Sequence, residues 1–143
     1  MPFSQETKQA LFDEAAKAIL KQGSICKATG SKTNCVYSDN DGRHCAIGHL
    51  LVNRGISLDG LDEDGESTGV DSAISVFNEG EDSPERYYRL LDGLCSIGAD
   101  SITDLRFLEE LQKAHDECDD MGHYRLGMKR LAGQAGLSDL ALT

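Results

Sequence analysis

The stretch NCVYSDNDGRHCAIGHLL, residues 34–51, decides how this chain folds because it joins a strand pattern, a turn and the start of a helix. Residues 35–37 are β-compatible. The Asp-Asn-Asp-Gly run at 39–42 favours a chain reversal, since its side chains bond their own backbone and its glycine tolerates positive φ. The apolar residues of 45–52 predict a short helix that ends at 53–55. We therefore interpret this stretch as a structural nucleus.

The segments before this nucleus predict both α and β structure. Residues 24–27 and 34–37 flank a Gly-Ser-Lys turn, and the two segments predict a small β-hairpin. Ahead of the hairpin, residues 5–21 predict an amphipathic helix that Gly23 ends. The apolar face of this helix consists of Leu11, Phe12, Ala15, Ala16, Ile19 and Leu20.

The segments after the nucleus begin with an acidic, glycine-rich stretch at 57–69, which predicts a mobile loop. Residues 70–77 then predict a short helix. In the helix that follows, Ser83, Pro84 and Glu85 are expected to be the N-cap, the first helical residue and an acid that complements the helix dipole.

Two more predicted helices complete the chain. One begins near 101–104, after Gly98 closes the helix before it, and the other spans 123–134 and ends at Gly136. The first of the two places five side chains on one face, namely Leu105, Leu108, Leu111, His115 and Cys118. These patterns predict a mainly α (α+β) fold in which five or six helices and the small hairpin form a single globular domain, residues 1–143.

The charge of the chain bears on its partners. The 143 residues include 25 acidic and 14 basic residues, which give a formal net charge of −11. Such a surface repels phosphate backbones, so direct binding to nucleic acid is not expected. The same long-range field attracts basic protein surfaces, including those that hold DNA or RNA.

Hydropathy and cysteine usage bear on where the protein works. No apolar run approaches the ~18 residues that span a bilayer, and residues 5–22 form an amphipathic pattern unlike that of a signal peptide. We therefore expect a cytoplasmic protein without a membrane partner. The odd number of cysteines favours reduced thiols over a disulfide framework. The five are Cys26, Cys35, Cys45, Cys95 and Cys118.

Two motifs resemble those of small, mostly uncharacterised proteins of tailed phages and prophages. The first motif, C-x-Y followed by D-G and C-A-I-G-x-L, consists of Cys35, Tyr37, Asp41, Gly42, Cys45, Ala46, Ile47, Gly48 and Leu50. The second, F-L-x-x-L-Q-x-x-H-D, consists of Phe107, Leu108, Leu111, Gln112, His115 and Asp116. The resemblance spans both halves of the chain and implies one shared fold and a location in the bacterial host cytoplasm. It implies no activity.

One alternative is a zinc site. Cys45 and His49 are spaced i,i+4, and His115 and Cys118 are spaced i,i+3, so each pair lies on one face of a predicted helix. If the two helices face each other, the four side chains form a tetrahedral Cys2His2 set that suits zinc. Against this, neither pair has the C-x2-C spacing of compact zinc modules, and cysteines are often buried simply as small apolar residues.

A second alternative is a cysteine-dependent enzyme. Cys45 lies at a predicted helix N-terminus, whose dipole favours a thiolate, and His115 with Asp116 would supply a base and its neighbour. No oxyanion-hole motif accompanies Cys45, and Asp116 is expected on a different helix face from His115. The competing interpretation of His115 is a core histidine that hydrogen-bonds a buried carbonyl or carboxylate. The acidic turns at 39–42 and 62–65 do not match the ligand spacing of a calcium-binding EF-hand loop.

The preferred hypothesis is a phage-encoded accessory protein that acts by protein–protein binding. Its partner would be a host or phage protein with a basic surface, and its acidic surface would inhibit a host nucleic-acid enzyme or defence complex. On this hypothesis the chain is not an enzyme and needs no cofactor. A structural role in the virion is a third interpretation. The candidate contact residues cluster in predicted loops and are Asp59, Asp62, Glu63, Asp64, Glu66, Glu79, Glu81 and Asp82.

Overall fold

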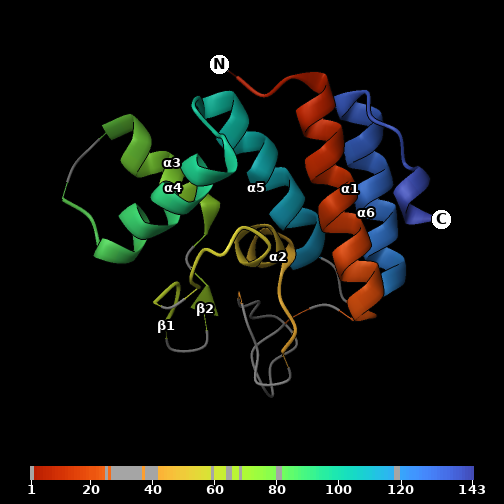
Figure 1. Ribbon diagram of the computed structural model, residues 1–143, viewed down its shortest axis with the longest axis horizontal. Coiled ribbons are helices and arrows are strands. Elements are labelled where there is room, and N and C mark those ends of the chain that lie inside the picture. The colour runs from red at the N-terminus through yellow and green to blue at the C-terminus, as the bar shows by residue number, and fades with distance from the viewer. Residues whose placement is uncertain are drawn as a thin grey trace.

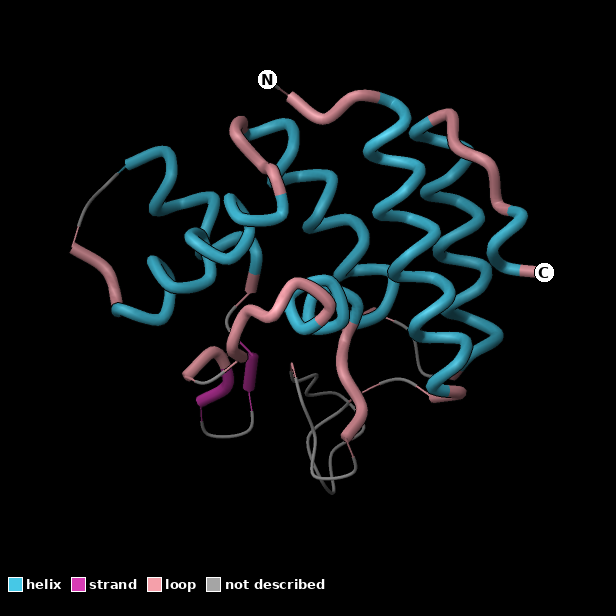
Figure 2. Tube along the Cα trace, in the orientation of Figure 1, coloured by secondary structure: helices cyan, strands magenta, loops and turns pink. Residues whose placement is uncertain are grey.

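The computed structural model of the chain describes residues 2–24, 26, 37, 42–58, 60–63, 66–67, 69–79, 82–117 and 120–143. Within these residues, six α-helices, two short strands and one 3-10 helix form the fold (Figure 1). The helices are α1 Gln5–Gln22, α2 Ala46–Val52, α3 Val70–Glu79, α4 Glu85–Ile97, α5 Ile102–Asp116, α6 Met121–Ala135 and the 3-10 helix η1 Leu140–Leu142. The strands are β1 Asp62–Glu63 and β2 Glu66–Ser67. Helices dominate the trace (Figure 2), which confirms the mainly α prediction.

Local sequence explains where α1 begins and ends. The Ser4 side chain accepts a hydrogen bond from the Thr7 amide and so caps the N-terminus. Gly23 follows the last turn with φ of 82°, a left-handed conformation that costs glycine little. The predicted apolar face is buried except for Leu20, which is partly buried against the core.

Helix α2 starts one residue later than predicted because Cys45 serves as its N-cap. The Cys45 Sγ accepts a hydrogen bond from the Gly48 amide at 3.3 Å. Gly48 lies so close to Tyr37 that a β-carbon at this position would stand 2.6 Å from the Tyr37 carbonyl oxygen. Glycine at position 48 therefore lets the helix pack directly against the backbone at residue 37.

The strands lie where the sequence predicted an acidic loop. β1 and β2 pair antiparallel, with Asp62 opposite Ser67 and Glu63 opposite Glu66. This pairing was not predicted, and the mobility of 57–69 stays a prediction. The β-hairpin predicted at 24–37 lies, apart from Ser24, Cys26 and Tyr37, outside the described residues and stays a prediction.

Helices α3 and α4 pack against each other. The predicted N-cap of α4 is wrong by one residue, since Pro84 occupies the cap position and helical geometry begins at Glu85. The cap carries no side-chain hydrogen bond, because proline has no polar side chain to offer. Gly98 closes α4 in a left-handed conformation, as predicted.

Helix α5 lies at the centre of the fold and packs against α1, α2, α3 and α6 (Figure 1). The Ser101 side chain caps it by accepting a hydrogen bond from the Asp104 amide. Its described apolar face is buried as predicted, and Phe107 adds to it. The buried Asp104 carboxylate accepts hydrogen bonds from the Phe3 amide at 2.8 Å and the Asp100 amide at 3.1 Å, which ties the segment before α1 to the start of α5.

The C-terminal part of the chain folds back onto α1. Helix α6 is capped by Asp120 and stops at Gly136, which confirms the predicted end. The Gln5 amide group donates hydrogen bonds to the carbonyls of Ala135 and Gly136. Gln9 both donates to and accepts from the backbone of Ser138. None of the described helices combines the length and apolar character that crossing a bilayer requires.

The close approach at Gly48 gives a paired test. Gly48→Ala is expected to reduce the free energy of unfolding by about 1–3 kcal/mol, because the methyl group meets a backbone oxygen that cannot rotate away. Gly133→Ala, within α6 and with open space around the added methyl, should instead increase it by about 0.5–1 kcal/mol. Urea unfolding of both variants measures the difference. Equal effects in the two variants would contradict the packing of α2 on residue 37.

Candidate functional site

His115 is a buried polar residue near the end of α5. Its Nε2 lies 2.8 Å from the Cys26 amide nitrogen, and its Nδ1 lies 2.9 Å from the Asp116 carboxylate. Because a backbone N–H only donates, Nε2 must accept, and the ring proton of the neutral imidazole is therefore assigned to Nδ1, which donates to Asp116. His115 is thus a buried histidine bound to a carboxylate, as predicted, but the Asp116 side chain is partly exposed rather than buried. The expectation that Asp116 faces away from His115 is wrong.

Gln112 extends this group by one turn of α5. Its side-chain nitrogen donates to Asp116 at 2.8 Å, and its side-chain oxygen accepts a hydrogen bond from the Ile47 amide at 3.0 Å. The Ile47 amide belongs to the first turn of α2, where the helix itself supplies no acceptor. We call Gln112, His115 and Asp116 the α5 polar triplet. It connects α5 to both α2 and Cys26.

Cys45 lies beside this triplet and has no exposed surface. Burial raises the pKa of the Cys45 thiol well above its ordinary value, and the charge of Asp116 raises it further. The expectation that the helix dipole stabilises a thiolate here is therefore wrong, because desolvation outweighs it. The Nε2 of His115 is already bound to Cys26, so it has no free lone pair with which to act as a base.

His49 lies on α2 but is held by α1. Its Nε2 lies 2.9 Å from the side-chain oxygen of Gln22, which also accepts a hydrogen bond from the His44 amide. The rings of His44 and His49 meet edge to face at a centroid distance of 5.1 Å. Burial, together with repulsion from His44 and His115, lowers the pKa of His49 from 6.5 to about 4.

The three described residues of the predicted zinc site each make hydrogen bonds to different partners. Cys45 caps α2, His49 binds Gln22, and His115 binds Cys26 and Asp116. Cys118 lies outside the described residues. In the part of the chain that is described, no three His, Cys, Asp or Glu side chains come together in a way that could hold a metal ion. The four-ligand set stays a prediction.

The candidate protein-binding residues fall into three groups. The backbones of Asp62, Glu63 and Glu66 form β1 and β2. Glu79 ends α3, and Asp82 precedes α4, with both side chains exposed. The remaining candidates, Asp59, Asp64 and Glu81, lie outside the described residues.

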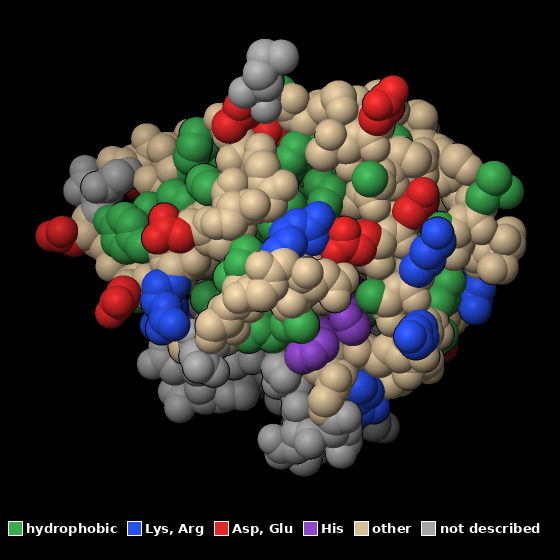
Figure 3. Space-filling model, in the orientation of Figure 1, with side chains coloured by type: hydrophobic (Ala, Val, Ile, Leu, Met, Phe, Trp, Pro, Cys, Tyr) green, Lys and Arg blue, Asp and Glu red, His purple; other side chains and the backbone are tan. Residues whose placement is uncertain are grey.

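The charge of the chain is strongly segregated along the sequence. Residues 55–85 contain ten acidic residues and no Lys, Arg or His, whereas the rest of the chain contains 15 acidic and 14 basic residues. The described parts of this segment run from beside α2 through β1 and β2, at the lower edge of Figure 1, to α3 at its left. Around α1 and α6, acidic and basic side chains alternate on the visible face (Figure 3). We call residues 55–85 the acidic segment.

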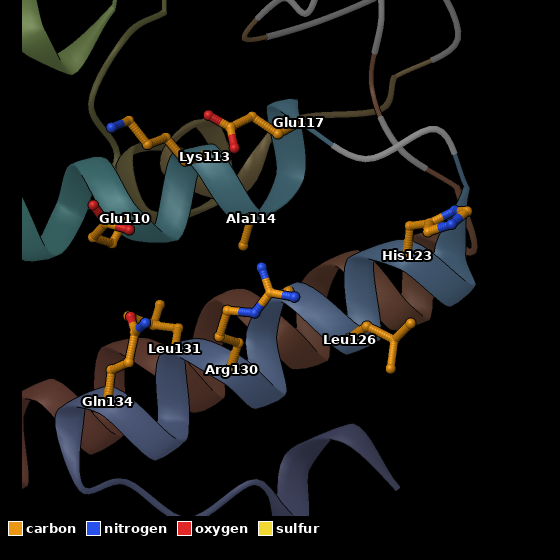
Figure 4. Close-up of a pocket in the computed structure, with 10 residues that line it drawn as sticks. Glu110, Lys113, Ala114, Glu117, His123, Leu126, Arg130, Leu131 and Gln134 are labelled. Atoms are coloured by element: carbon orange, nitrogen blue, oxygen red, sulfur yellow. The ribbon is translucent and has the colours of Figure 1, made fainter.

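A groove between α5 and α6 was not predicted. It has a volume of about 290 Å³, and Ala114 and Gly127 lie where the two helices approach each other. Figure 4 shows the Arg130 guanidinium reaching from α6 toward α5, while Lys113 and Glu117 point away from α6. Because the lining carries both signs of charge and is open to solvent, it favours neither an anion nor a cation as ligand.

The lowered pKa of His49 predicts a pH dependence of stability. Between pH 6.5 and about 4, His49 is protonated in the unfolded chain but mostly neutral in the folded protein. The free energy of unfolding therefore falls as the pH falls through this range. His49→Gln should weaken the dependence, and His123→Gln, which changes an exposed ring on α6, should leave it unchanged. Urea midpoints at pH 7.5 and pH 5 measure this. If the urea midpoint of His49→Gln changed with pH as much as that of the parent chain, the lowered pKa of His49 would be contradicted.

The buried state of Cys45 predicts a low reactivity. In the native chain, iodoacetamide should modify the exposed Cys95 roughly 100-fold faster than Cys45, because labelling of Cys45 requires local or global opening. Peptide mass spectrometry after timed labelling separates the two sites. The difference should disappear in denaturant, which serves as the control. A native Cys45 that reacts faster than Cys95 would restore the nucleophile hypothesis.

Comparison with protein-family models, curated proteins and solved structures gives no match for this chain, so its function is argued from its own residues.

Proposed function

We propose that the chain is a protein-binding module that contacts a basic partner through the acidic segment. The observation that carries this proposal is the segregation of charge. The ten acidic residues of the segment account for most of the formal net charge of −11. A uniformly acidic surface would need no explanation beyond solubility, but a concentrated one creates a directional field.

The described acidic side chains support this choice of surface. Glu79, Asp82 and Glu85 are exposed and lie where α3 ends and α4 begins. Among the described residues, no ion pair holds any of these three carboxylates to a basic side chain. Their charges are therefore available to an approaching protein.

The partner class follows from charge complementarity. Proteins that bind DNA or RNA concentrate Lys and Arg in the surfaces that contact phosphates, and an acidic protein competes for those surfaces. We propose that the partner is an enzyme or defence complex of this kind and that binding inhibits it. The resemblance to phage and prophage proteins supports a bacterial host as the source of the partner.

The zinc-binding or cysteine-dependent alternative receives less support from the geometry. Cys45 caps α2, His49 of α2 binds Gln22 of α1, and His115 binds the amide of Cys26. A zinc site would have to break those bonds before it formed.

The proposal predicts binding that depends on both salt and the position of charge. A basic protein captured from a bacterial extract should bind the chain with a dissociation constant that rises with ionic strength. The triple variant Glu79→Gln, Asp82→Asn, Glu85→Gln should weaken binding by about tenfold or more at low salt. Calorimetry or surface plasmon resonance with the purified partner measures both effects.

The matched control removes the same number of charges elsewhere. Glu110→Gln, Glu117→Gln and Asp139→Asn change exposed acids on α5, just after α5, and before η1. This control should alter the dissociation constant by less than about threefold, since its charges lie outside the acidic segment. Equal weakening in both triple variants would show that only total charge matters. A search that finds no salt-sensitive basic partner would also contradict the proposal.

A further inference from the structure

The exposed aromatic side chains lie on two consecutive helices, at the end of α3 and at the start of α4. The chain has four Phe and four Tyr, all within the described residues, and only Phe77 and Tyr88 are exposed, at 41% and 37%. Phe77 lies in the last turn of α3, and Tyr88 lies in the first turn of α4. Both therefore belong to the end of the α3–α4 pair where the two helices are joined.

The position of Phe77 explains why it remains exposed. It follows Ala73 by four residues and Ile74 by three, so it continues the apolar face of α3 that these two residues bury in the core. In the last turn of α3, Val76 is buried whereas the Phe77 ring is exposed, so the apolar stripe reaches the surface at Phe77. A large ring left uncovered in this way is typical of a contact surface.

Exposed acidic side chains lie between the two aromatic residues in the sequence. Glu79, Asp82 and Glu85 are exposed and fall between Phe77 and Tyr88 in the sequence. Hydrophobic and acidic side chains are neighbours over this end of the molecule (Figure 3). We call Phe77, Glu79, Asp82, Glu85 and Tyr88 the α3–α4 tip.

The nearest basic residues along the chain are engaged elsewhere. The Arg86 guanidinium lies over the Tyr87 ring, 5.2 Å from its centroid. The Arg89 guanidinium packs so closely against Gly60 that a β-carbon on residue 60 would clash with it. Neither contact involves a carboxylate of the α3–α4 tip.

We infer that the α3–α4 tip binds a basic protein segment in which an apolar side chain lies among Lys or Arg residues. The apolar side chain would cover Phe77 and Tyr88, while the cations would contact the three carboxylates and the ring faces. This inference rests on the proposed function and adds to it the chemical class of the recognised segment. The rings would supply the selectivity that charge attraction alone lacks.

Nucleic acid and a second copy of the chain fit the tip less well than a basic protein segment does. Nucleic acid would be repelled by the carboxylates that flank the rings. In a symmetric pair of chains, the tips would meet each other and bring two acidic segments together, which like-charge repulsion opposes. A basic segment is the occupant whose charge complements the surface.

The test uses two synthetic peptides of equal length and equal positive charge. One alternates Lys with Ser, and the other replaces several Ser residues with Leu. The Leu peptide should bind the parent chain about tenfold more tightly, because an anchored apolar side chain contributes this much at a contact. Fluorescence anisotropy gives the dissociation constants. Amide shifts of the labelled parent chain should change most at residues 76–79 and 82–89.

Matched variants locate the preference. Phe77→Ser with Tyr88→Ser should abolish the preference for Leu while leaving salt-sensitive binding of both peptides. Val52→Ser removes an apolar side chain of similar exposure on α2 and should retain the preference for the Leu peptide. Equal affinity of the parent for both peptides, a preference that survives in the double variant, or shifts centred away from the tip would each overturn the inference and leave the proposed function standing. If neither peptide binds at low salt, the proposed function fails as well.

Discussion

The hydrogen bonds of the α5 polar triplet are the constraint on which the middle of the structure depends. Helix α2 has seven residues, which is too short to persist without tertiary support. Gln112 supplies an acceptor to its first turn, and His115 holds the backbone at Cys26 on the other side. Each of these amides is buried, and leaving one unpaired costs about 1–3 kcal/mol. The triplet therefore determines where both segments lie on α5.

The same bonds explain why reactive residue types give little evidence of reactivity here. A histidine that acts as a base needs a free nitrogen, and a thiol that acts as a nucleophile needs solvent or a cation nearby. His115 has both nitrogens bound, and Cys45 lies buried beside a carboxylate. Both residues serve instead as hydrogen-bonding groups between elements. Both side chains therefore act in positioning segments of the fold.

Local patterns in the sequence predicted much of the helical fold because caps act over a few residues. Gly23, Gly98 and Gly136 end their helices as expected, and Ser101 starts α5. The β1–β2 pairing was missed because charged residues with low strand propensity form it. The 3-10 helix η1 was missed because its support comes from α1 and α6, which are distant in sequence.

The candidate site was harder to predict for the same reason. The bond between Gln112 and Ile47 spans 65 residues, and that between His115 and Cys26 spans 89, so no local pattern encodes either. One signal was present, since polar residues on an otherwise apolar helix face need partners in the core. At His115 this signal predicted a bonding partner in the core, whereas no partner was predicted for Gln112. The exposure of Phe77 also depends on where the core ends, which periodicity along α3 does not reveal.

The separation of charge between the acidic segment and the nearly neutral remainder has a consequence before any contact forms. A chain whose negative charge is concentrated in one segment has an asymmetric charge distribution, and the field of a cationic surface exerts a torque on such a distribution. For the proposed basic partner, that torque would turn the acidic segment toward the cationic surface during approach. Unproductive orientations would be corrected while the surfaces are still about a Debye length apart, roughly 10 Å at 0.1 M salt. Such a dipole would orient the proposed encounter independently of how well the final contact fits.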